Sequence, residues 1–596
     1  MRTLGKLEYC KAWSNKTNVW MITDIQPHVA IKLKSLFPKI SKEQTNNFVF
    51  ENNGNNCADL DWFRDRFPLT MSEDDAARLR LGRFEYEQQL EHIEKILLPD
   101  YTPPPFSGLK PGCSVRNYQA QAVQVLMLRG SLLLGDKMGL GKTFSAMAAM
   151  LQPGTLPAAV VVKTHLQIQW KEAIESFTDL KVHCINKASP YENMLNGTQE
   201  LPKADVYIFK YSQLSGWSDI FATGFFKFAI YDEIQELRRG DESAKGRGAY
   251  VLSNHTKYRL GLSGTPLVNY GIEIHNIMKA IDDTVLGDRI SFMREWGGDD
   301  KKSVREPDAL GAFLREQQVF LRRTRRDIGQ EAPPINRIFE TVSTDTKAMN
   351  SIREIARQLA IKTVSGSFTQ RGSAARELDL LARMTTGVAK AKSVAAYVKL
   401  LLDDGIPVVL AGWHREVYEI WLRELKDYNP MMFTGSESAS QKRKNAKAFM
   451  DGKSNLLIMS LRSGDGLNGL QYRCSFVVFG ELDWSAQFHD QMIARLDREH
   501  QPDQVTAIFL NSSDGSDPPM IDLLARKSDQ ARGIIDPNEA PKATFTDLSR
   551  VKALAQQFLD QEMIEKMKNS NEEVPDLPDA EMENIDQEII IDMSEA

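Results

Sequence analysis

The stretch SLLLGDKMGLGKTFSAMAAML, residues 131–151, decides how this chain folds. Its first five residues form a short apolar run of the kind that is buried on both faces of a sheet. A glycine-rich turn follows, and the last ten residues have the small and apolar side chains of a helix. A strand, a tight turn and a helix in this order predict one unit of a parallel α/β sheet.

The turn GDKMGLGKT, residues 135–143, has the residue types of a phosphate-binding loop. Gly139 and Gly141 allow the backbone to approach phosphate oxygens, and the amide groups at the helix start then face the anion. Lys142 would reach the β- and γ-phosphates, and the Thr143 hydroxyl would hold Mg²⁺. The full pattern requires a glycine where Asp136 stands, so the alternative is a plain glycine-rich turn with one lysine.

Short apolar runs recur along the chain and alternate with helical patterns. They cover residues 158–162, 206–209, 228–233 and 259–264 in a first series, and 407–412, 455–460, 475–480 and 505–510 in a second. Such alternation implies parallel sheets that are covered by helices on both faces. The predicted fold class is therefore α/β, with two tandem lobes.

Other signals divide the rest of the chain. YTPPPFSGLKPG, residues 101–112, cannot continue a helix or a central strand and is expected to be a linker, and before it Ser72 or Asp74 can cap a helix toward Leu97. The predicted parts are an N-terminal accessory domain at 1–100, the linker, lobe 1 at 113–340, a helical interlobe region at 341–384, lobe 2 at 385–530, a helical extension at 531–570 and an acidic disordered tail at 571–596.

Charge and composition leave a nucleic-acid partner open. The chain has 596 residues and a net charge of −6, but residues 571–596 contain ten Asp or Glu and no Lys or Arg. Without that tail the net charge becomes +4, so the mean charge does not exclude DNA binding. The five cysteines form no C-x-x-C pair, and no apolar run reaches the length of a membrane span or a secretory signal. A reducing cytoplasm is the expected location.

FAIYDEIQ, residues 228–235, places two carboxylates at the carboxyl end of a predicted strand, where ligands bind in open α/β sheets. Asp232 is expected to hold Mg²⁺ or its water, and Glu233 to orient and deprotonate an attacking water. The alternative is an acidic pair in a solvated turn. GLSGTP, residues 261–266, ends the next strand, and Ser263 and Thr265 there can hydrogen-bond the two carboxylates or a phosphate, unless they only shape a tight turn.

QFHDQMIARLDREHQ, residues 487–501, predicts a helix with Gln491, Arg495 and Arg498 at i, i+4 and i+7 on one face. Two arginines on one face can meet a γ-phosphate and stabilise charge that develops in phosphoryl transfer. The alternative is a solvated face of salt bridges with the nearby acidic residues.

These residues resemble the Swi/Snf-type DNA translocases, a branch of the superfamily two helicases, from about Tyr118 to Lys527. The similar motifs, in chain order, are RNYQAQAV, GDKMGLGKT, VVVKTHLQIQW, DEIQ, GLSGTPLVN, FLRRTRRDI, FTGSESASQKRKNAKAF, SLRSGDGLNGL and QMIARLDREHQ. Several positions depart from the family pattern. Lys137 replaces an acidic residue, and Gln235 replaces the histidine that usually links hydrolysis to the DNA-facing motifs, so altered coupling is expected. The segment 163–165 lacks the usual proline, and Gly469 and Glu499 also differ from the residues that the family prefers.

The resemblance implies two RecA-like lobes with ATP and Mg²⁺ between them. The implied nucleotide contacts from lobe 1 are Arg116, Gln119 (on the adenine), Gly139, Gly141, Lys142, Thr143, Asp232 and Glu233, and those from lobe 2 are Gln491, Arg495 and Arg498. The implied DNA contacts are Lys163, Thr164, Tyr211, Ser263, Arg462 and Ser463. The motif that ends at Trp170 is expected to approach the DNA backbone, and the cations of residues 322–326 either contact DNA or brace the lobes.

The function that follows is an ATP-dependent translocase on duplex or branched DNA, acting as a monomer in replication, recombination or repair, in a bacterial or phage-infected cell. One alternative is a strand-separating helicase. The other is a regulatory ATPase that acts on a partner such as RNA polymerase, because residues 571–596 can dock as an extended peptide or compete with DNA for a basic cleft. The region 1–100 is expected to help read DNA structure.

Overall fold

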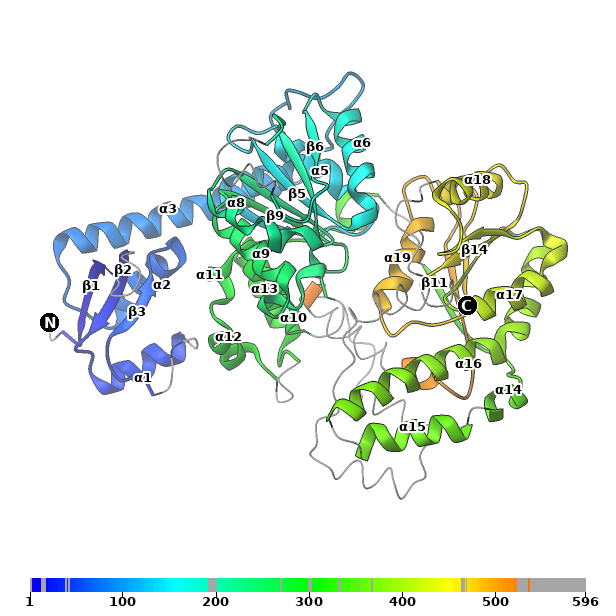
Figure 1. Cartoon of the computed structure of the whole chain (residues 1–596). Helices are drawn as coiled ribbons and strands as arrows, with labels where there is room; N and C mark the ends of the chain where they lie inside the picture. The colour runs from blue at the N-terminus through cyan, green and yellow to red at the C-terminus, as the bar shows by residue number, and fades with distance from the viewer. Residues whose placement is uncertain are drawn as a thin grey trace. The chain divides into compact units, whose positions relative to one another are not determined.

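The structure is a computed structural model, and it divides into two compact units (Figure 1). One unit comprises Met1–Ile328 with Gln530–Glu539, and the other comprises Gly329–Asp529 with Ala540–Ala596. The structure describes residues 3–11, 18–37, 40, 43–190, 201–267, 271–298, 303–330, 333, 335–351, 353–365, 368–461, 467, 469–521 and 534–535. The predicted acidic tail lies outside these residues, as does all of the helical extension except 534–535.

The N-terminal domain is a three-stranded antiparallel sheet covered by helices. Its elements are β1 (Lys6–Lys11), β2 (Asn18–Thr23), α1 (Pro27–Leu36), β3 (Phe48–Glu51), α2 (Gly54–Arg66) and α3 (Glu73–Leu97). Ser72 caps α3, because its hydroxyl accepts the amide N–H of Asp75 at 3.1 Å. Further along α3, Ile93 and Ile96 are buried in a cluster that belongs to the first α/β lobe. The accessory domain is therefore attached to that lobe through one helix.

The first lobe is built on a seven-stranded sheet in which every described pairing is parallel. The strand order is β10-β4-β9-β8-β5-β7-β6. The strands are β4 (Ser131–Leu134), β5 (Ala158–Val162), β6 (Val182–Cys184), β7 (Val206–Lys210), β8 (Phe228–Asp232), β9 (Tyr258–Leu262) and β10 (Phe320–Leu321). The order of the strands in the sheet thus differs from their order along the chain, as it does in doubly wound folds.

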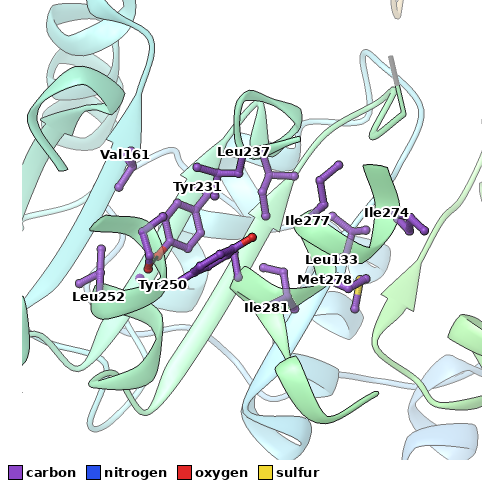
Figure 2. Close-up of a cluster of buried hydrophobic side chains, with 14 of the residues drawn as sticks. Leu133, Val161, Tyr231, Leu237, Tyr250, Leu252, Ile274, Ile277, Met278 and Ile281 are labelled. Carbon is purple, nitrogen blue, oxygen red and sulfur yellow. Dashed lines mark hydrogen bonds between the residues drawn. The ribbon is translucent and has the colours of Figure 1, made fainter. Parts of the chain in front are cut away.

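Helices cover both faces of this sheet, since alternate strand residues enter different clusters. Leu133 packs in the cluster that Figure 2 shows, whereas Leu132 and Leu134 pack on the opposite face. The helices are α4 (Asn117–Arg129), α5 (Lys142–Met150), α6 (Gln167–Phe177), α8 (Ser218–Ala222), α9 (Ala244–Asn254), α10 (Glu273–Ile281), α11 (Asp283–Leu286), α12 (Arg289–Trp296) and α13 (Pro307–Glu316). The strand, turn and helix that residues 131–151 predict are present as β4 and α5.

The second lobe has a six-stranded sheet, again parallel, in the order β11-β16-β15-β12-β14-β13. Its strands are β11 (Asn336–Thr341), β12 (Val408–Gly412), β13 (Met431–Phe433), β14 (Leu456–Ser460), β15 (Phe476–Phe479) and β16 (Thr506–Asn511). Its helices are α14 (Thr346–Ser351), α15 (Arg353–Ser365), α16 (Phe368–Asp403), α17 (Arg415–Glu424), α18 (Ala439–Met450) and α19 (Ala486–Leu496). The prediction of an α/β fold with two tandem RecA-like lobes is confirmed.

Three predicted boundaries differ from the structure. β11 pairs with β16 along its whole length, so residues 336–340 belong to the second sheet and not to lobe 1. This edge strand is largely exposed and therefore carries no apolar signal in its sequence. α16 continues through the predicted division at 384/385. Ile534 and Ile535, placed in a separate C-terminal extension by the sequence, are buried in a core cluster of the first lobe.

Within the described residues, no helix combines the length and apolar character that a membrane crossing requires.

Candidate nucleotide site of the first lobe

The turn after β4 has the backbone shape that its glycines predict. Gly139 and Gly141 have φ values of +89° and +73°, which favour glycine because other residues meet steric strain there. Gly141 is also the N-cap of α5, and its carbonyl oxygen accepts the amide N–H groups of Phe144 at 2.9 Å and Ser145 at 3.2 Å, so the helix starts directly at this turn. Lys142 and Thr143 are the first two residues of that helix, and both are half-buried.

Lys142 lies among opposite charges at the strand ends. Its Nζ donates a hydrogen bond to the carbonyl oxygen of Asp136 at 2.6 Å. Burial lowers the pKa of Lys142 below its ordinary value, while the carboxylates of Glu233 and Asp136 act in the opposite direction. The lysine and the acidic pair predicted from separate motifs are thus close enough to influence each other's charge.

Gln119 fastens α4 to the phosphate turn. Its Oε1 accepts the backbone N–H of Arg116 at 3.0 Å, and its Nε2 donates to the carbonyl of Leu140 at 3.2 Å. The hydroxyl of Tyr118 donates to the same carbonyl at 3.0 Å. Gln119 is buried and Arg116 is exposed. The observed contacts support the turn, and contact of Gln119 or Arg116 with an adenine stays a prediction.

Asp232 ends β8 and is held from two sides. The indole Nε1 of Trp170 donates to its Oδ2 at 2.8 Å, and the hydroxyl of Tyr211 donates to its carbonyl oxygen at 2.9 Å. Burial, together with the neighbouring carboxylate of Glu233, raises the pKa of Asp232 to about 7. The hydrogen bond directs the indole N–H of Trp170 to Asp232. Because Trp170 is only 4% exposed, the expectation that it approaches DNA is not supported.

Glu233 adopts the left-handed conformation, with φ of +54°, which turns its side chain at the end of the strand. The side-chain amide of Gln235 donates to Glu233 Oε2 at 2.5 Å. Gln235 is 1% exposed, and its Oε1 has no hydrogen-bond partner among the described residues. Gln235, which stands where the family has a histidine, therefore holds the carboxylate of Glu233, the candidate general base. Unlike a histidine, its amide does not change protonation state near neutral pH.

The residues present fit a magnesium ion. A carboxylate with a raised pKa beside a second carboxylate is stabilised by a cation, and the hydroxyl of Thr143 is a second oxygen donor of the type that Mg²⁺ prefers. Asp232 and Thr143 would hold the ion, which would neutralise part of the charge on nucleotide phosphates.

The GLSGTP turn packs against the lysine. Ser263 is buried and its Oγ accepts the N–H of Thr265 at 3.0 Å, so it shapes the turn and makes no hydrogen bond to the two carboxylates in the described structure. A Cβ on Gly264 would lie 3.3 Å from Lys142 Nζ. The absence of a side chain at this position thus leaves room for the lysine head group.

Arg322 and Arg323 stabilise this site from within the first lobe. The sequence had allowed two roles for the cations of residues 322–326, namely contact with DNA or a brace between the lobes. Arg322 Nη1 donates to the carbonyls of Gly135 at 2.7 Å and of Gly264 at 3.1 Å, so it joins the two turns beside Lys142. Arg323 is buried and forms an ion pair with Asp136, with 2.6 Å between Nη2 and Oδ2. The aspartate at position 136 could have predicted this ion pair from the sequence, because a carboxylate that is buried in a turn requires a cation as its partner.

The predicted DNA contacts fall into three groups. Thr164 is exposed, and half-buried Lys163 lies 3.8 Å from Glu236 through its Nζ and the Oε1 of that residue. Tyr211 and Ser263 are 5% and 1% exposed, and burial to this degree does not support direct contact with DNA. Arg462 and Ser463 lie outside the described residues.

The second lobe presents the predicted arginines less regularly than expected. α19 ends at Leu496, so Gln491 and Arg495 share a helix face but Arg498 lies beyond the helix. Arg495 is 7% exposed, and its Nη1 donates to the carbonyl of Leu467 at 3.4 Å. Burial lowers the pKa of Arg498, whose Nε donates to the carbonyl of Ala494 at 3.3 Å. Gln491 Nε2 has no partner in the described part of the chain.

Known proteins resemble this chain over its two lobes. SWI/SNF-related matrix-associated actin-dependent regulator of chromatin subfamily A-like protein 1 of Drosophila melanogaster is 25% identical over 438 residues, which cover 70% of this chain and 55% of the relative. DNA annealing helicase and endonuclease ZRANB3 of Mus musculus is 24% identical over 426 residues, which cover 67% of this chain and 38% of the relative. The chain spans about half the length, or less, of these curated relatives.

Among solved structures, the chain is similar to the Sulfolobus solfataricus SWI2/SNF2 ATPase core in complex with dsDNA, at 17% identity and a TM-score of 0.36. The alignment covers 78% of this chain and 99% of that chain. The two parallel sheets with their covering helices define the fold. Residues 118–386 match the family model of the SNF2-related domain, and the resemblance of this part of the chain to the Swi/Snf-type proteins is confirmed.

Proposed function

We propose that the chain is a DNA-dependent ATPase that moves along duplex or branched DNA. The observation that carries this proposal is that Lys142, which follows β4, and Asp232 and Glu233, which end β8, lie at the same carboxyl edge of one parallel sheet. Ligands bind at this edge in open α/β folds. The names of two relatives support the choice of substrate and partner: a Mycoplasma pneumoniae relative is named an ATP-dependent helicase, and the mouse relative is named a DNA annealing helicase.

In the proposed reaction, Lys142 neutralises the terminal phosphates of ATP, and Glu233 accepts a proton from the attacking water while Gln235 holds its carboxylate. Arg495 and Arg498 of the second lobe supply positive charge to the transferring phosphoryl group. A change in the arrangement of the lobes between nucleotide states would then advance the chain along DNA.

The DNA contacts in this proposal are phosphate contacts. Lys163 and Thr164 follow the carboxyl end of β5, and Thr164 is exposed. Contacts of this kind do not depend on base sequence and weaken as the salt concentration rises. The mouse relative is named a DNA annealing helicase, which makes a forked substrate an informative choice for the test.

The test measures ATP hydrolysis with single-stranded DNA, duplex DNA, forked DNA and RNA as the added polymer. We expect stimulation by duplex or forked DNA, and we expect Glu233→Gln to bind ATP but to lose 10²-fold or more in turnover, as about 10²–10⁴ is typical for a lost general base. An ATPase that no DNA stimulates would refute the proposal. Release of a labelled strand from the fork would instead favour the strand-separating helicase.

A further inference from the structure

Trp170 makes a contact that its place in the hydrophobic core does not require. Its ring packs in the cluster on one face of the first sheet, yet its indole N–H leaves that cluster to donate to the carboxylate of Asp232 at 2.8 Å. Hydrogen bonds to an ionised carboxylate are shorter and about twice as strong as those between neutral groups. A phenylalanine would fill the same volume without this bond, so the indole nitrogen has a specific effect on Asp232.

The bond leaves one carboxylate oxygen for a ligand. Trp170 uses Oδ2, and within the described residues no other hydrogen bond reaches this carboxylate. The backbone of Asp232 is fixed as well, since its carbonyl accepts the Tyr211 hydroxyl at 2.9 Å. Both the main chain and one oxygen of Asp232 are therefore held before any cation arrives, and the direction of Oδ1 is set.

The same stretch of chain touches the acidic segment at a second point. Lys163 precedes a 3₁₀ turn at Thr164–Leu166, which leads directly into α6 and to Trp170 in its fourth position. The Lys163 ammonium lies 3.8 Å from the Glu236 carboxylate. Residues 163–170 are thus tied at both ends to residues 232–236, through the ion pair of Lys163 with Glu236 and the hydrogen bond of Trp170 to Asp232.

We propose that Trp170 is a positioning residue, which fixes the Asp232 carboxylate for the cation of a bound nucleotide and links that cation site to the DNA-facing segment 163–166. The inference rests on the proposed function: its cation part requires nucleotide binding, and its DNA part also requires DNA binding. Its cation part concerns how tightly this chain binds a nucleotide with and without Mg²⁺. That difference can be measured without hydrolysis and without DNA.

The first experiment compares Trp170→Phe with the wild-type full-length chain. A fluorescent ATP analogue is titrated in Mg²⁺ and in EDTA, and the ratio of the two dissociation constants is the readout. We expect Trp170→Phe to reduce the Mg²⁺-dependent gain in affinity by about tenfold, the size of one charge-assisted hydrogen bond, and to leave affinity in EDTA unchanged. A purely structural role would weaken both affinities together.

The matched control is Trp217→Phe in the same lobe. Trp217 is fully buried and also donates its indole N–H, to the carbonyl of Lys187 at 3.1 Å. This variant loses the same chemical group at a site away from Asp232, so its ratio of dissociation constants should equal that of the wild type. A ratio in Trp170→Phe that matches the control would overturn the proposal.

A spectroscopic measurement keeps the inference testable if Trp170→Phe does not fold. The nine tryptophans can be labelled with ¹⁵N in the wild-type chain, and Asp232→Asn identifies the indole N–H resonance that depends on Asp232. We expect Mg²⁺ with nucleotide to shift this resonance, and nucleotide in EDTA to leave it in place. The opposite result, no shift with Mg²⁺, would contradict a link between Trp170 and the cation.

The DNA part has its own readout. Linkage requires that DNA change the affinity for Mg²⁺-nucleotide by the same factor as nucleotide changes the affinity for DNA. We expect this factor to fall toward one in Trp170→Phe and to stay at the wild-type value in Trp217→Phe. A factor of one in the wild type would overturn the proposed link between the cation site and DNA, yet the Mg²⁺ ratio would still decide the role of Trp170 at the cation site.

Discussion

Arg323 and Asp136 form an ion pair inside the first lobe, with 2.6 Å between Nη2 of the arginine and Oδ2 of the aspartate. The Asp136 side chain is fully buried, and it also accepts the backbone N–H of Arg323 at 3.0 Å. Arg323 follows β10, next to β4, so the pair connects the end of the first unit to the phosphate turn. The phosphate turn, residues 135–143, is therefore stabilised by a buried ion pair in addition to the backbone conformations of its glycines.

Breaking this pair should destabilise the first lobe strongly. Arg323→Met leaves the Asp136 carboxylate buried and unpaired, and we expect the free energy of unfolding to fall by about 3–5 kcal/mol. Asp136→Asn combined with Arg323→Met should recover part of the loss, since no lone charge remains. Urea unfolding of the full chain measures both.

A surface pair supplies the control for that comparison. Arg337 and Asp490 are 2.6 Å apart, but their side chains are 41% and 35% exposed, and Arg337→Met should cost less than about 1 kcal/mol. If Arg323→Met costs no more than Arg337→Met, the buried pair does not support the turn as described.

Asp232 should make stability depend on pH. Its pKa in the folded chain is raised to about 7, so the folded state binds this proton more tightly than the unfolded state does. Stability is therefore lost as the pH rises from about 4 to 7, and the loss is complete above 7. At about 1.4 kcal/mol per pKa unit, we expect Asp232→Asn to stabilise the nucleotide-free protein by up to about 4 kcal/mol at pH 8, and the gain to vanish near pH 4.

Thermal unfolding at a series of pH values measures this gain. Addition of Mg²⁺ and nucleotide should reverse the order of stability at pH 8, because the wild-type carboxylate then has a cation partner. A gain for Asp232→Asn that is the same at pH 4 and pH 8 would show that the carboxylate is not the cause.

Gly141→Ala should weaken nucleotide binding beyond the effect of backbone strain. A Cβ at this position would lie 2.6 Å from Gln119 Nε2, and φ is +73°. Gly405 has φ of +75° and nothing within 4 Å of a Cβ, so Gly405→Ala adds the same strain, of about 1 kcal/mol, without a clash. We expect at least tenfold weaker binding of the ATP analogue in Gly141→Ala and no change in Gly405→Ala. Equal affinities would argue against contact between Gln119 and the turn.

Arg498→Ala should lower turnover more than ATP affinity if this guanidinium stabilises charge in the transition state. An arginine in that role contributes about 10³-fold or more to the rate. Arg415, which is 81% exposed on α17, provides the control, and Arg415→Ala should leave the turnover number unchanged. Steady-state kinetics with saturating DNA separates the two effects, and a loss confined to KM would favour the salt-bridge interpretation.

Much of the candidate site could be read from the sequence because its residues sit in short local patterns. Lys142 and Thr143 follow a glycine turn, and Asp232 and Glu233 end a buried apolar run, so each position is fixed by neighbours within a few residues. The indole bond of Trp170 and the ion pair of Arg323 could not be read in this way. Each joins residues more than 60 positions apart, and only the strand order brings them together.

The type of fold and the chemistry of the phosphate turn follow from the amino-acid sequence, because periodic burial and glycine conformations are local properties of the chain. The tertiary structure alone decided which partners hold that chemistry in place. It buried Tyr211 and Trp170 against Asp232, moved residues 336–341 into the second sheet and set Arg322 between two turns. Parallel strands are joined by long crossovers, so neighbours in such a sheet are distant in sequence, and no local pattern records them.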